Sequence, residues 1–301
     1  MTSRTTRHGP AAASSTHANG PMLPTNTDAE RLRIAAPDCR NNGLRPMPSL
    51  ADRFRNAIAR RFFVALRRAT HRMPRRLEVI GNERVLVAAP HLDDEAIPCG
   101  GTILLHALAG GQVHVVFTTD SAGQSPLPDA RDCLRSVRRA EAAAAKQVLG
   151  YQTSELYDFP DGGLVQHEEA LRDRLAASIA EFQPTRILCP FPSDAHADHQ
   201  ATSLATALAA VDAGFEGDLW AYEMWTPIWP NVAIDISAVA ADKERAIASY
   251  ATQNYDRDYV GAAMGLARYR GLLHGVAYAE AFYACRASRF WELASQLDRI
   301  P

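Results

Sequence analysis

The sequence predicts an α/β fold, in which a Rossmann-like, doubly wound and mostly parallel sheet carries helices on both faces. From about residue 83, short apolar runs that suit buried strands alternate with longer segments of helical periodicity. The composition of the 301 residues, 47% hydrophobic and 22% charged, is that of a globular protein with a substantial core.

Five apolar runs are interpreted as strands: RVLVAA at 84–89, VHVVFTT at 113–119, ELYDF at 155–159, RILCP at 186–190 and DLWAYE at 218–223. Helices are predicted between them, at about 94–108, 131–149, 168–182 and 198–212. Gly150 is expected to end the second of these helices as a C-cap. After residue 223 the alternation weakens, and we predict helices over 242–250 and 260–273 and a last strand over 279–285.

The first 77 residues differ in composition from the rest of the chain. Residues 1–48 lack periodicity and are rich in Ala, Ser, Thr, Asn, Pro and Gly, which predicts disorder. Residues 49–77 are predicted to form a basic amphipathic helix, because positions 51–76 carry nine arginines and one acid. Two interpretations stay open: this helix contacts an anionic membrane surface or partner, or it docks on the domain with its arginines in solvent. One catalytic domain is expected over 78–301.

Charge and cysteine content exclude several classes of protein. A net charge of −2 gives no general attraction to nucleic acid or membrane. No apolar run is long enough to span a bilayer, and the N-terminus lacks the apolar stretch of a secretory signal. Five cysteines, an odd number without a CxxC pair, fit reduced thiols better than a disulfide framework. We therefore expect a cytoplasmic protein that does not bind nucleic acid.

Two polar motifs each follow a predicted strand. HLDDE at 91–95 follows the strand at 84–89, and HADH at 196–199 follows the strand at 186–190. Because ligands of doubly wound sheets bind beyond the carboxyl ends of the strands, we expect both motifs at one site. Two imidazoles and a carboxylate, from His91, Asp94 and His199, bind Zn²⁺ well and leave a position for water. The same ligand set also admits Fe²⁺.

The remaining polar residues of these motifs suit catalysis. Adjacent side chains diverge at a strand end, so Asp93 can face the water while Asp94 faces the metal, which makes Asp93 a candidate general base. A protonated His196 would stabilise an oxyanion, and Asp198 would orient one of the histidines. The alternative is local, because acids and capping residues are favoured at helix starts. The placement of both motifs after separate strands favours the metal site.

The two motifs resemble the signatures of the PIG-L/LmbE-like zinc-dependent N-acetylglucosaminyl deacetylases, and the resemblance extends over about 84–283. RRAE at 138–141 and FPDG at 159–162 match a helix and a loop of that family. The family has a Rossmann-like sheet and hydrolyses an acetamide on a sugar, releasing acetate. The resemblance implies that zinc is held by the expected triad, with the base and the oxyanion group assigned as above.

The resemblance also implies that Arg138 and Asp161 contact sugar hydroxyls. Two local alternatives remain: Arg138 pairs with nearby acids on a solvated helix face, and Asp161 is only a turn residue. The chain departs from the family at Asp194, where some members place a tyrosine acid. The proton donor to the leaving amine therefore stays open between Asp93 and His196. An aromatic cluster is either a sugar platform or core: Trp220, Tyr222, Trp225 and Trp229.

We therefore expect a zinc-dependent amidohydrolase that removes acetyl from an N-acetylglucosamine-type conjugate, a small-molecule substrate. Two rival hypotheses are kept. In the first, the same centre cuts a longer N-acyl amide on a lipid- or peptide-linked sugar. In the second, the chain is a non-catalytic sugar-binding protein on the same fold.

Overall fold

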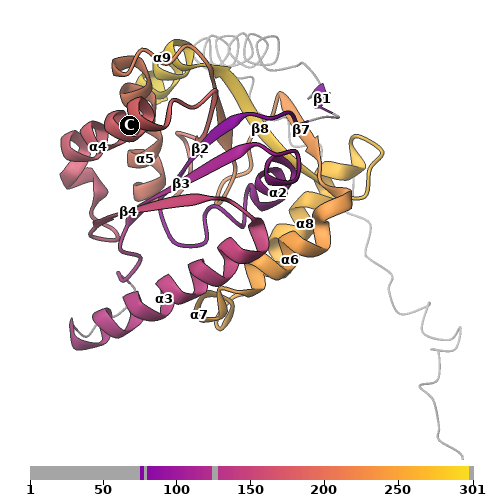
Figure 1. Ribbon diagram of the computed structural model, residues 1–301, viewed down its shortest axis with the longest axis horizontal. Coiled ribbons are helices and arrows are strands. Elements are labelled where there is room, and N and C mark those ends of the chain that lie inside the picture. Colours follow the sequence, from indigo (N-terminus) through magenta and orange to yellow (C-terminus); the bar gives the residue numbers. More distant parts are fainter. Residues whose placement is uncertain (1–74, 78–79, 124–127, 298–301) are drawn as a thin grey trace, which may run out of the picture. The chain divides into compact units, whose positions relative to one another are not determined.

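The structure is a computed structural model that describes residues 75–77, 80–123 and 128–297 (Figure 1). All of these residues belong to one compact unit. The described strands form one sheet in the order β1-β7-β8-β6-β5-β2-β3-β4. Their bounds are β1 Arg75–Leu77, β2 Arg84–Ala89, β3 Gln112–Thr119, β4 Thr153–Phe159, β5 Arg186–Pro190, β6 Asp218–Tyr222, β7 Val232–Asp235 and β8 Ala279–Arg286.

Neighbouring strands of this sheet run parallel wherever β8 is not involved, and β8 runs antiparallel to both β6 and β7. The predicted fold class, a mostly parallel sheet with helices on both faces, is confirmed. Strands β2 and β5 have the predicted bounds, and β3, β4, β6 and β8 differ from prediction by one or two residues. Strands β1 and β7 were not predicted, because runs of three and four residues are too short to show a period.

Helices cover both faces of the sheet (Figure 1). Helices α2, α3, α6 and α8 contribute to the apolar core on one face, and α4, α5 and α9 contribute to the core on the other. The strands supply both cores because successive side chains of a strand point to opposite faces of the sheet. In β2, Val85 and Val87 belong to the first core, whereas Leu86 belongs to the second. Helix bounds are α2 Gly100–Leu108, α3 Pro128–Leu149, α4 Glu168–Phe182, α5 Ala197–Asp212, α6 Ala240–Ala248, α7 Ala251–Asn254, α8 Tyr259–Leu272 and α9 Ala287–Leu297.

The order of the strands places a switch point beside β2. The chain moves from β2 outward to β3 and β4, then returns to the other side of β2 with β5 and continues to β6. The loops that leave β2 and β5 therefore diverge to opposite faces and leave a crevice between them, which is where doubly wound sheets bind ligands. The first polar motif lies on the loop after β2, and the second runs from the end of the loop after β5 into the first turn of α5.

The prediction that a helix starts at about Asp94 is wrong. The segment from His91 to Cys99 is a series of turns, and α2 begins at Gly100. Asp93 has φ +146°, which a helix cannot contain, and Pro98 has no N–H to donate within a helix. The extra turns hold the first polar motif outside the regular helix.

The predicted basic helix over 49–77 is wrong at its C-terminal end, because Arg75–Leu77 forms strand β1 and pairs with β7. Pro74 directly precedes this strand, and a proline disfavours helix continuation. The rest of that segment and the predicted disordered residues 1–48 lie outside the described residues.

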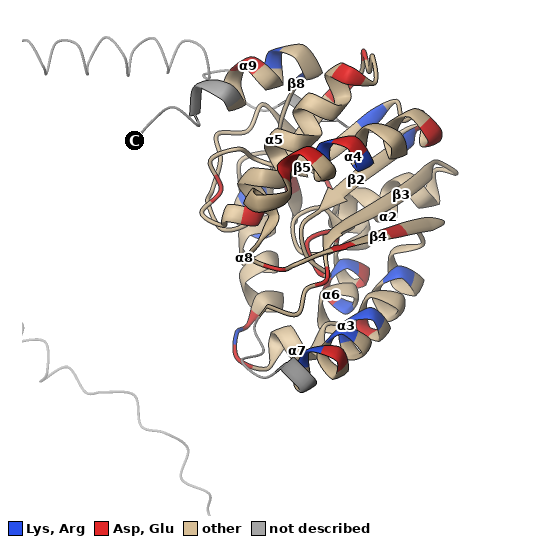
Figure 2. Cartoon of the chain, turned by 90° about the vertical axis from the view of Figure 1, so that its left-hand side faces the viewer, with Lys and Arg blue, Asp and Glu red and all other residues tan. Residues whose placement is uncertain are grey.

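Charge on the surface is mixed. Lys and Arg alternate with Asp and Glu along α3 and α4 (Figure 2). In the part of the chain that the structure describes, no helix has the length and apolarity required to cross a bilayer.

Candidate active site

The loop after β2 is fixed by hydrogen bonds from its own backbone. The N–H of Leu92 donates to Ser121 Oγ at 2.8 Å, and the N–H groups of Ala96 and Ile97 donate to the carbonyl of Asp93 at 2.9 and 3.0 Å. Asp93 is held in a backbone conformation that costs energy for a non-glycine residue. The strained turn directs the side chains of Asp93 and Asp94 to different neighbours, as the sequence predicted.

The second motif opens helix α5. His196 is the N-cap residue, and its Nδ1 accepts a hydrogen bond from the N–H of Asp198 at 3.2 Å. Asp198 is fully buried, and its carboxylate accepts from the N–H groups of Gly162 and Leu164 at 2.7 and 3.1 Å. His199 lies in the first turn of α5 and is also fully buried. The start of α5 thus points two imidazoles and a carboxylate toward the loop after β2.

The structure brings the predicted metal ligands together. One carboxylate oxygen, Oδ2 of Asp94, lies 3.1 Å from His91 Nδ1 and 3.2 Å from His199 Nε2. The other ring nitrogen of His91 lies 3.2 Å from both Asp161 and Asp198. Two overlapping groups have ligand atoms that all lie within 4.8 Å of one another: His91, His196 and His199, and His91, Asp161 and Asp198.

The donor set fits a divalent transition metal. Both ring nitrogens of His199 are buried, and each lies 3.2 Å from a carboxylate oxygen, yet neither contact has the geometry of a hydrogen bond. These nitrogens are therefore available as ligands. Imidazole nitrogens and a carboxylate oxygen suit Zn²⁺, and the same set accommodates Fe²⁺.

The two adjacent carboxylates ionise differently. Burial and then the charge of Asp94 raise the pKa of Asp93 to about 7, although the guanidinium of Arg138 acts in the opposite direction. Burial also opposes ionisation of Asp94, but the adjacent imidazoles of His199 and His91 hold its pKa well below the usual range. One carboxylate is thus permanently charged, as a ligand must be, and its neighbour can gain and lose a proton near neutral pH.

His196 differs from its predicted state. Burial, followed by the charges of His91 and His199, lowers the pKa of the His196 imidazole, so the protonated ring expected from the sequence is disfavoured. Because Nδ1 accepts from the backbone N–H of Asp198, the neutral ring carries its proton on Nε2. The neutral side chain is therefore still a hydrogen-bond donor.

A cavity of about 170 Å³ lies over these groups. Arg138 and Asp161, the two predicted sugar contacts, both line it. Arg138 is buried, its Nη2 donates to the carbonyl of Leu92 at 2.7 Å and lies 3.4 Å from Asp93 Oδ2, so the alternative of a solvated ion pair on the helix surface is wrong. Asp161 does more than form a turn, because it accepts from the Gly123 N–H at 3.0 Å while contacting His91. Their contact with a sugar stays a prediction.

Asp194 links the predicted metal ligand His199 to the chain that follows β6. Its carboxylate accepts from the N–H groups of His196 at 3.1 Å and Trp225 at 2.9 Å, and it lies 3.2 Å from His199 Nδ1. The sequence marked Asp194 only as a departure from a family pattern. Nothing in the local sequence shows that its partners come from the segment after β6, 31 residues further on.

One side of the cavity was only partly predicted. Met224, Trp225, Gln253 and Tyr259 line it, all from the part of the chain where the strand–helix alternation weakens, and only Trp225 was named from the sequence. Of the aromatic cluster, Trp220 and Tyr222 are core residues, whereas Trp225 is 41% exposed and faces the cavity. The signal for Trp225 was present in the sequence, since a large aromatic side chain after a strand end suits a ligand site.

Comparison with known proteins points to the same family as the two sequence motifs. The family described as PIG-L: GlcNAc-PI de-N-acetylase matches residues 86–210, which contain both motifs and the loop of Asp161. The chain belongs to the PIG-L/LmbE-like deacetylase family. Within it, the chain is 31% identical over 133 residues to a probable N-acetyl-α-D-glucosaminyl L-malate deacetylase 2 of Bacillus cereus, a match that covers 42% of this chain and 60% of the relative.

Two solved structures match this PIG-L family member over a larger share of the chain. A conserved protein of Thermus thermophilus is 30% identical, and the match covers 67% of this chain and 94% of that one with a TM-score of 0.59. The N,N′-diacetylchitobiose deacetylase of Pyrococcus horikoshii shows the same fold at 22% identity and a TM-score of 0.62, covering 80% of this chain and 97% of that one. The chain spans about 60% of the length of the first curated relatives that it matches.

Proposed function

We propose that this PIG-L family member is a metal-dependent hydrolase that removes the N-acetyl group from an N-acetylglucosamine-type amino-sugar conjugate. One observation carries the proposal. Half-buried His91 and buried Asp94 and His199, three groups suited to hold a metal, meet next to Asp93, whose pKa is shifted in the opposite direction from that of Asp94. A binding protein needs no such split between neighbouring acids, whereas hydrolysis of an amide needs both a fixed charge and a proton acceptor.

The metal would be Zn²⁺ or Fe²⁺, held by His91, Asp94 and His199, and when bound it polarises the amide carbonyl and makes water acidic. Asp93 takes the proton of the attacking water, because a carboxylate with a pKa of about 7 is well matched to a base at neutral pH. Arg138 holds Asp93 in place through the 3.4 Å contact to its Oδ2. The water oxygen adds to the carbonyl carbon of the amide.

His196 stabilises the charge that then develops on the carbonyl oxygen, because its Nε2–H remains free to donate while Nδ1 is tied to the backbone. Asp93 next donates the proton that it accepted to the amide nitrogen, and the carbon–nitrogen bond breaks to give an amine and acetate. Asp198 orients His91, whose Nε2 it meets at 3.2 Å. Arg138 and Asp161 bind sugar hydroxyls on the polar side of the cavity.

The names of the relatives support the amino sugar as the substrate class. The Bacillus cereus protein is described as acting on N-acetylglucosaminyl malate, and the Pyrococcus horikoshii protein on diacetylchitobiose. Both substrates are small conjugates of N-acetylglucosamine, although the larger groups attached to the sugar differ. A polar cavity beside the metal ligands suits the shared part, the acetamido sugar.

The test separates the base from the ligands. Asp93→Asn is expected to keep about one equivalent of metal, measured by elemental analysis, and to lower kcat for acetate release by about 100-fold or more. His199→Ala is expected to lose both metal and activity, since it removes a ligand. His114→Gln, a histidine outside the site, is the matched control and should match the wild type. Full activity in Asp93→Asn would remove the base assignment, and metal binding without turnover across a panel of acetamido sugars would favour the binding-protein alternative.

A further inference from the structure

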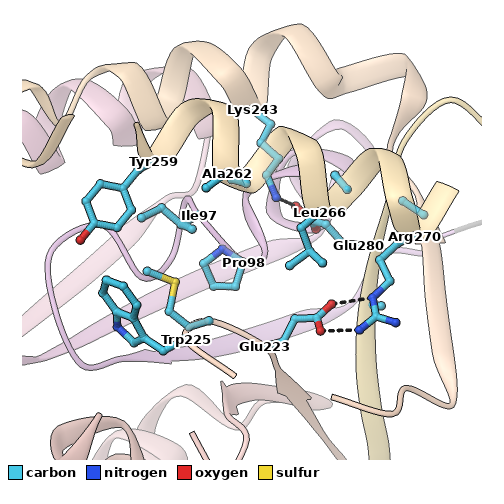
Figure 3. Close-up of a pocket in the computed structure, with 15 residues that line it drawn as sticks. Ile97, Pro98, Glu223, Trp225, Lys243, Tyr259, Ala262, Leu266, Arg270 and Glu280 are labelled. Carbon is cyan, nitrogen blue, oxygen red and sulfur yellow. Dashed lines mark hydrogen bonds and ion pairs between the residues drawn. The ribbon is translucent and has the colours of Figure 1, made fainter. Parts of the chain in front are cut away.

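A second cavity, of about 180 Å³, lies beside the active site (Figure 3). We call it the α8 pocket and define it by Ile97, Pro98, Ala263, Leu266, Ala267 and Ala281. Ile97 and Pro98 belong to the loop that carries Asp93 and Asp94, so the pocket starts directly behind the catalytic loop. Its volume is far above the roughly 10–15 Å³ that one water molecule requires.

The two cavities share a wall. Met224, Trp225 and Tyr259 line the active-site cavity on its apolar side and also line the α8 pocket. The rings of Trp225 and Tyr259 meet edge to face with centroids 5.9 Å apart, and Figure 3 shows both at one end of the α8 pocket. The two cavities therefore adjoin along these three side chains, and only side chains separate them.

The charged groups in the pocket wall are already paired. Glu223 binds the guanidinium of Arg270 through Nε at 2.8 Å and through Nη2, and Lys243 donates to Glu280 (Figure 3). Glu280 also accepts from the N–H groups of Gly101 and Thr102 at 2.8 and 2.7 Å. A charged ligand would have to break one of these buried pairs, which is costly. The pocket thus suits an uncharged, apolar group.

We propose that the α8 pocket binds an acyl chain, so that the enzyme, besides removing acetyl, also removes longer N-acyl groups from the same amino sugar and does so faster. This inference rests on the proposed function and specifies its substrate. The carbonyl carbon of an amide carries the nitrogen on one side and the acyl chain on the other. With the sugar on the polar side, near Arg138 and Asp161, the acyl chain points to the shared wall and the α8 pocket beyond it.

The size of the effect follows from burial. Each methylene that moves from water into an apolar pocket increases binding by about fourfold. An acetyl group has no methylene and leaves the α8 pocket unfilled. A chain of about six carbons is therefore expected to raise kcat/KM by about tenfold or more over acetyl, after the cost of ordering the chain.

The experiment measures kcat/KM of the metal-loaded enzyme on methyl glycosides of N-acetyl-, N-butanoyl-, N-hexanoyl- and N-octanoylglucosamine. Leu266→Trp fills the pocket and is expected to lower kcat/KM for the hexanoyl substrate by about tenfold, while changing the acetyl substrate by less than about threefold. Leu272→Trp adds the same bulk to an exposed position of α8, where the side chain is 75% exposed, and should match the wild type on both substrates.

The outcomes distinguish this inference from the proposed function. Hydrolysis of the acetyl substrate without a gain for longer chains would overturn the inference alone, and so would equal chain-length profiles in wild type and Leu266→Trp. The octyl glycoside of N-acetylglucosamine tests the other end of the substrate. If its kcat/KM exceeds that of the methyl glycoside, and if Leu266→Trp abolishes the difference, the pocket binds the aglycone instead. No hydrolysis at any length would end the proposed function. Calorimetric binding of N-hexanoylglucosamine, lost in Leu266→Trp and kept in Leu272→Trp, would then still support the pocket.

Discussion

The pKa of a side chain at this site depends more on its neighbours than on its residue type. Asp93 and Asp94 are the same residue type in adjacent positions, yet their pKa values move in opposite directions. Asp94 faces two imidazoles, whereas Asp93 faces one guanidinium at 3.4 Å and is otherwise buried. The sequence could predict that the two side chains diverge. It could not give the size of the difference, because Arg138 comes from a helix 45 residues away.

Asp194 provides a prediction at the same scale. Asp194→Asn keeps the volume of the side chain but removes the charge that faces His199 Nδ1 at 3.2 Å. Partners that orient a metal-binding histidine typically contribute 10- to 100-fold to metal affinity, so we expect metal affinity to fall by about tenfold or more. Competition with a fluorescent chelator measures this affinity.

The same variant separates positioning from folding. His196 and Trp225 donate to different carboxylate oxygens, so the single amide oxygen of Asp194→Asn can accept from only one of them. The Tm of the metal-free variant should therefore fall by only the few degrees that correspond to the loss of one hydrogen bond. Asp158→Asn is a matched control on the surface, where Asp158 pairs with Arg139. Unchanged metal affinity in Asp194→Asn would show that the carboxylate only ties down the loop after β6.

The elements themselves were predictable where a local period exists. Strands β2 and β5 and helix α4 have the predicted bounds, because each shows a clear apolar period over its whole length. The start of α2 was misplaced by six residues, since Asp94 and its neighbours carry the signals of a helix start but are held in turns by tertiary hydrogen bonds. The antiparallel direction of β8 was not predictable, because it depends on the path of the chain after β6 and not on the residues of β8.

Helix α2 gives a prediction at the level of elements. A Cβ atom on Gly101 would lie 2.7 Å from Cγ2 of Ile236, closer than real contacts allow, so α2 sits against the end of β7 only because this residue is glycine. Gly101→Ala is expected to lower the free energy of unfolding by about 1–3 kcal/mol through overpacking. Adding Ile236→Ala to this variant should recover part of that loss. Chemical denaturation of the wild type, the two single variants and the double variant measures the coupling energy between the two positions.

Gly265 is the matched control for this change. It lies in the middle of α8, it is exposed, and a Cβ there would meet nothing within 4 Å. Gly265→Ala should therefore stabilise the protein by about 0.5–1 kcal/mol, as alanine does in an exposed helix. Equal effects of the two substitutions would contradict the close packing of α2 and show a general response to alanine.

At the scale of the whole molecule, the site exists because of the strand order. The two motifs are 105 positions apart in the chain, at residues 91 and 196, and they meet because β2 and β5 are neighbours in the sheet. A sequence pattern of alternating strands and helices predicts the edge of the sheet where ligands bind. It does not predict which strands are adjacent, and the pairing of β2 with β5 is given by the structure. The α8 pocket had no motif at all, because its wall combines the first catalytic loop with α8 and β8.

Global stability is expected to depend on a histidine outside the site. His106 is fully buried on α2, with Nδ1 3.6 Å from Glu83 Oε2, and burial followed by the charge of Arg186 lowers its pKa to about 3. The unfolded chain holds this histidine at its ordinary pKa of about 6.5. Between these two values the unfolded state binds more protons than the folded state, so stability is highest above pH 6.5 and is lost as the pH falls.

His106→Leu tests this contribution to the pH dependence. For this residue the loss of wild-type stability between pH 7 and pH 5 is about 2 kcal/mol. The variant should therefore show a shallower decrease over that interval, measured as the free energy of unfolding in urea at each pH. His274→Leu, in the turn between α8 and β8, is the control and should keep the wild-type slope. The same slope in His106→Leu would mean that carboxylates and the active-site histidines, not His106, set the acid limit of the fold.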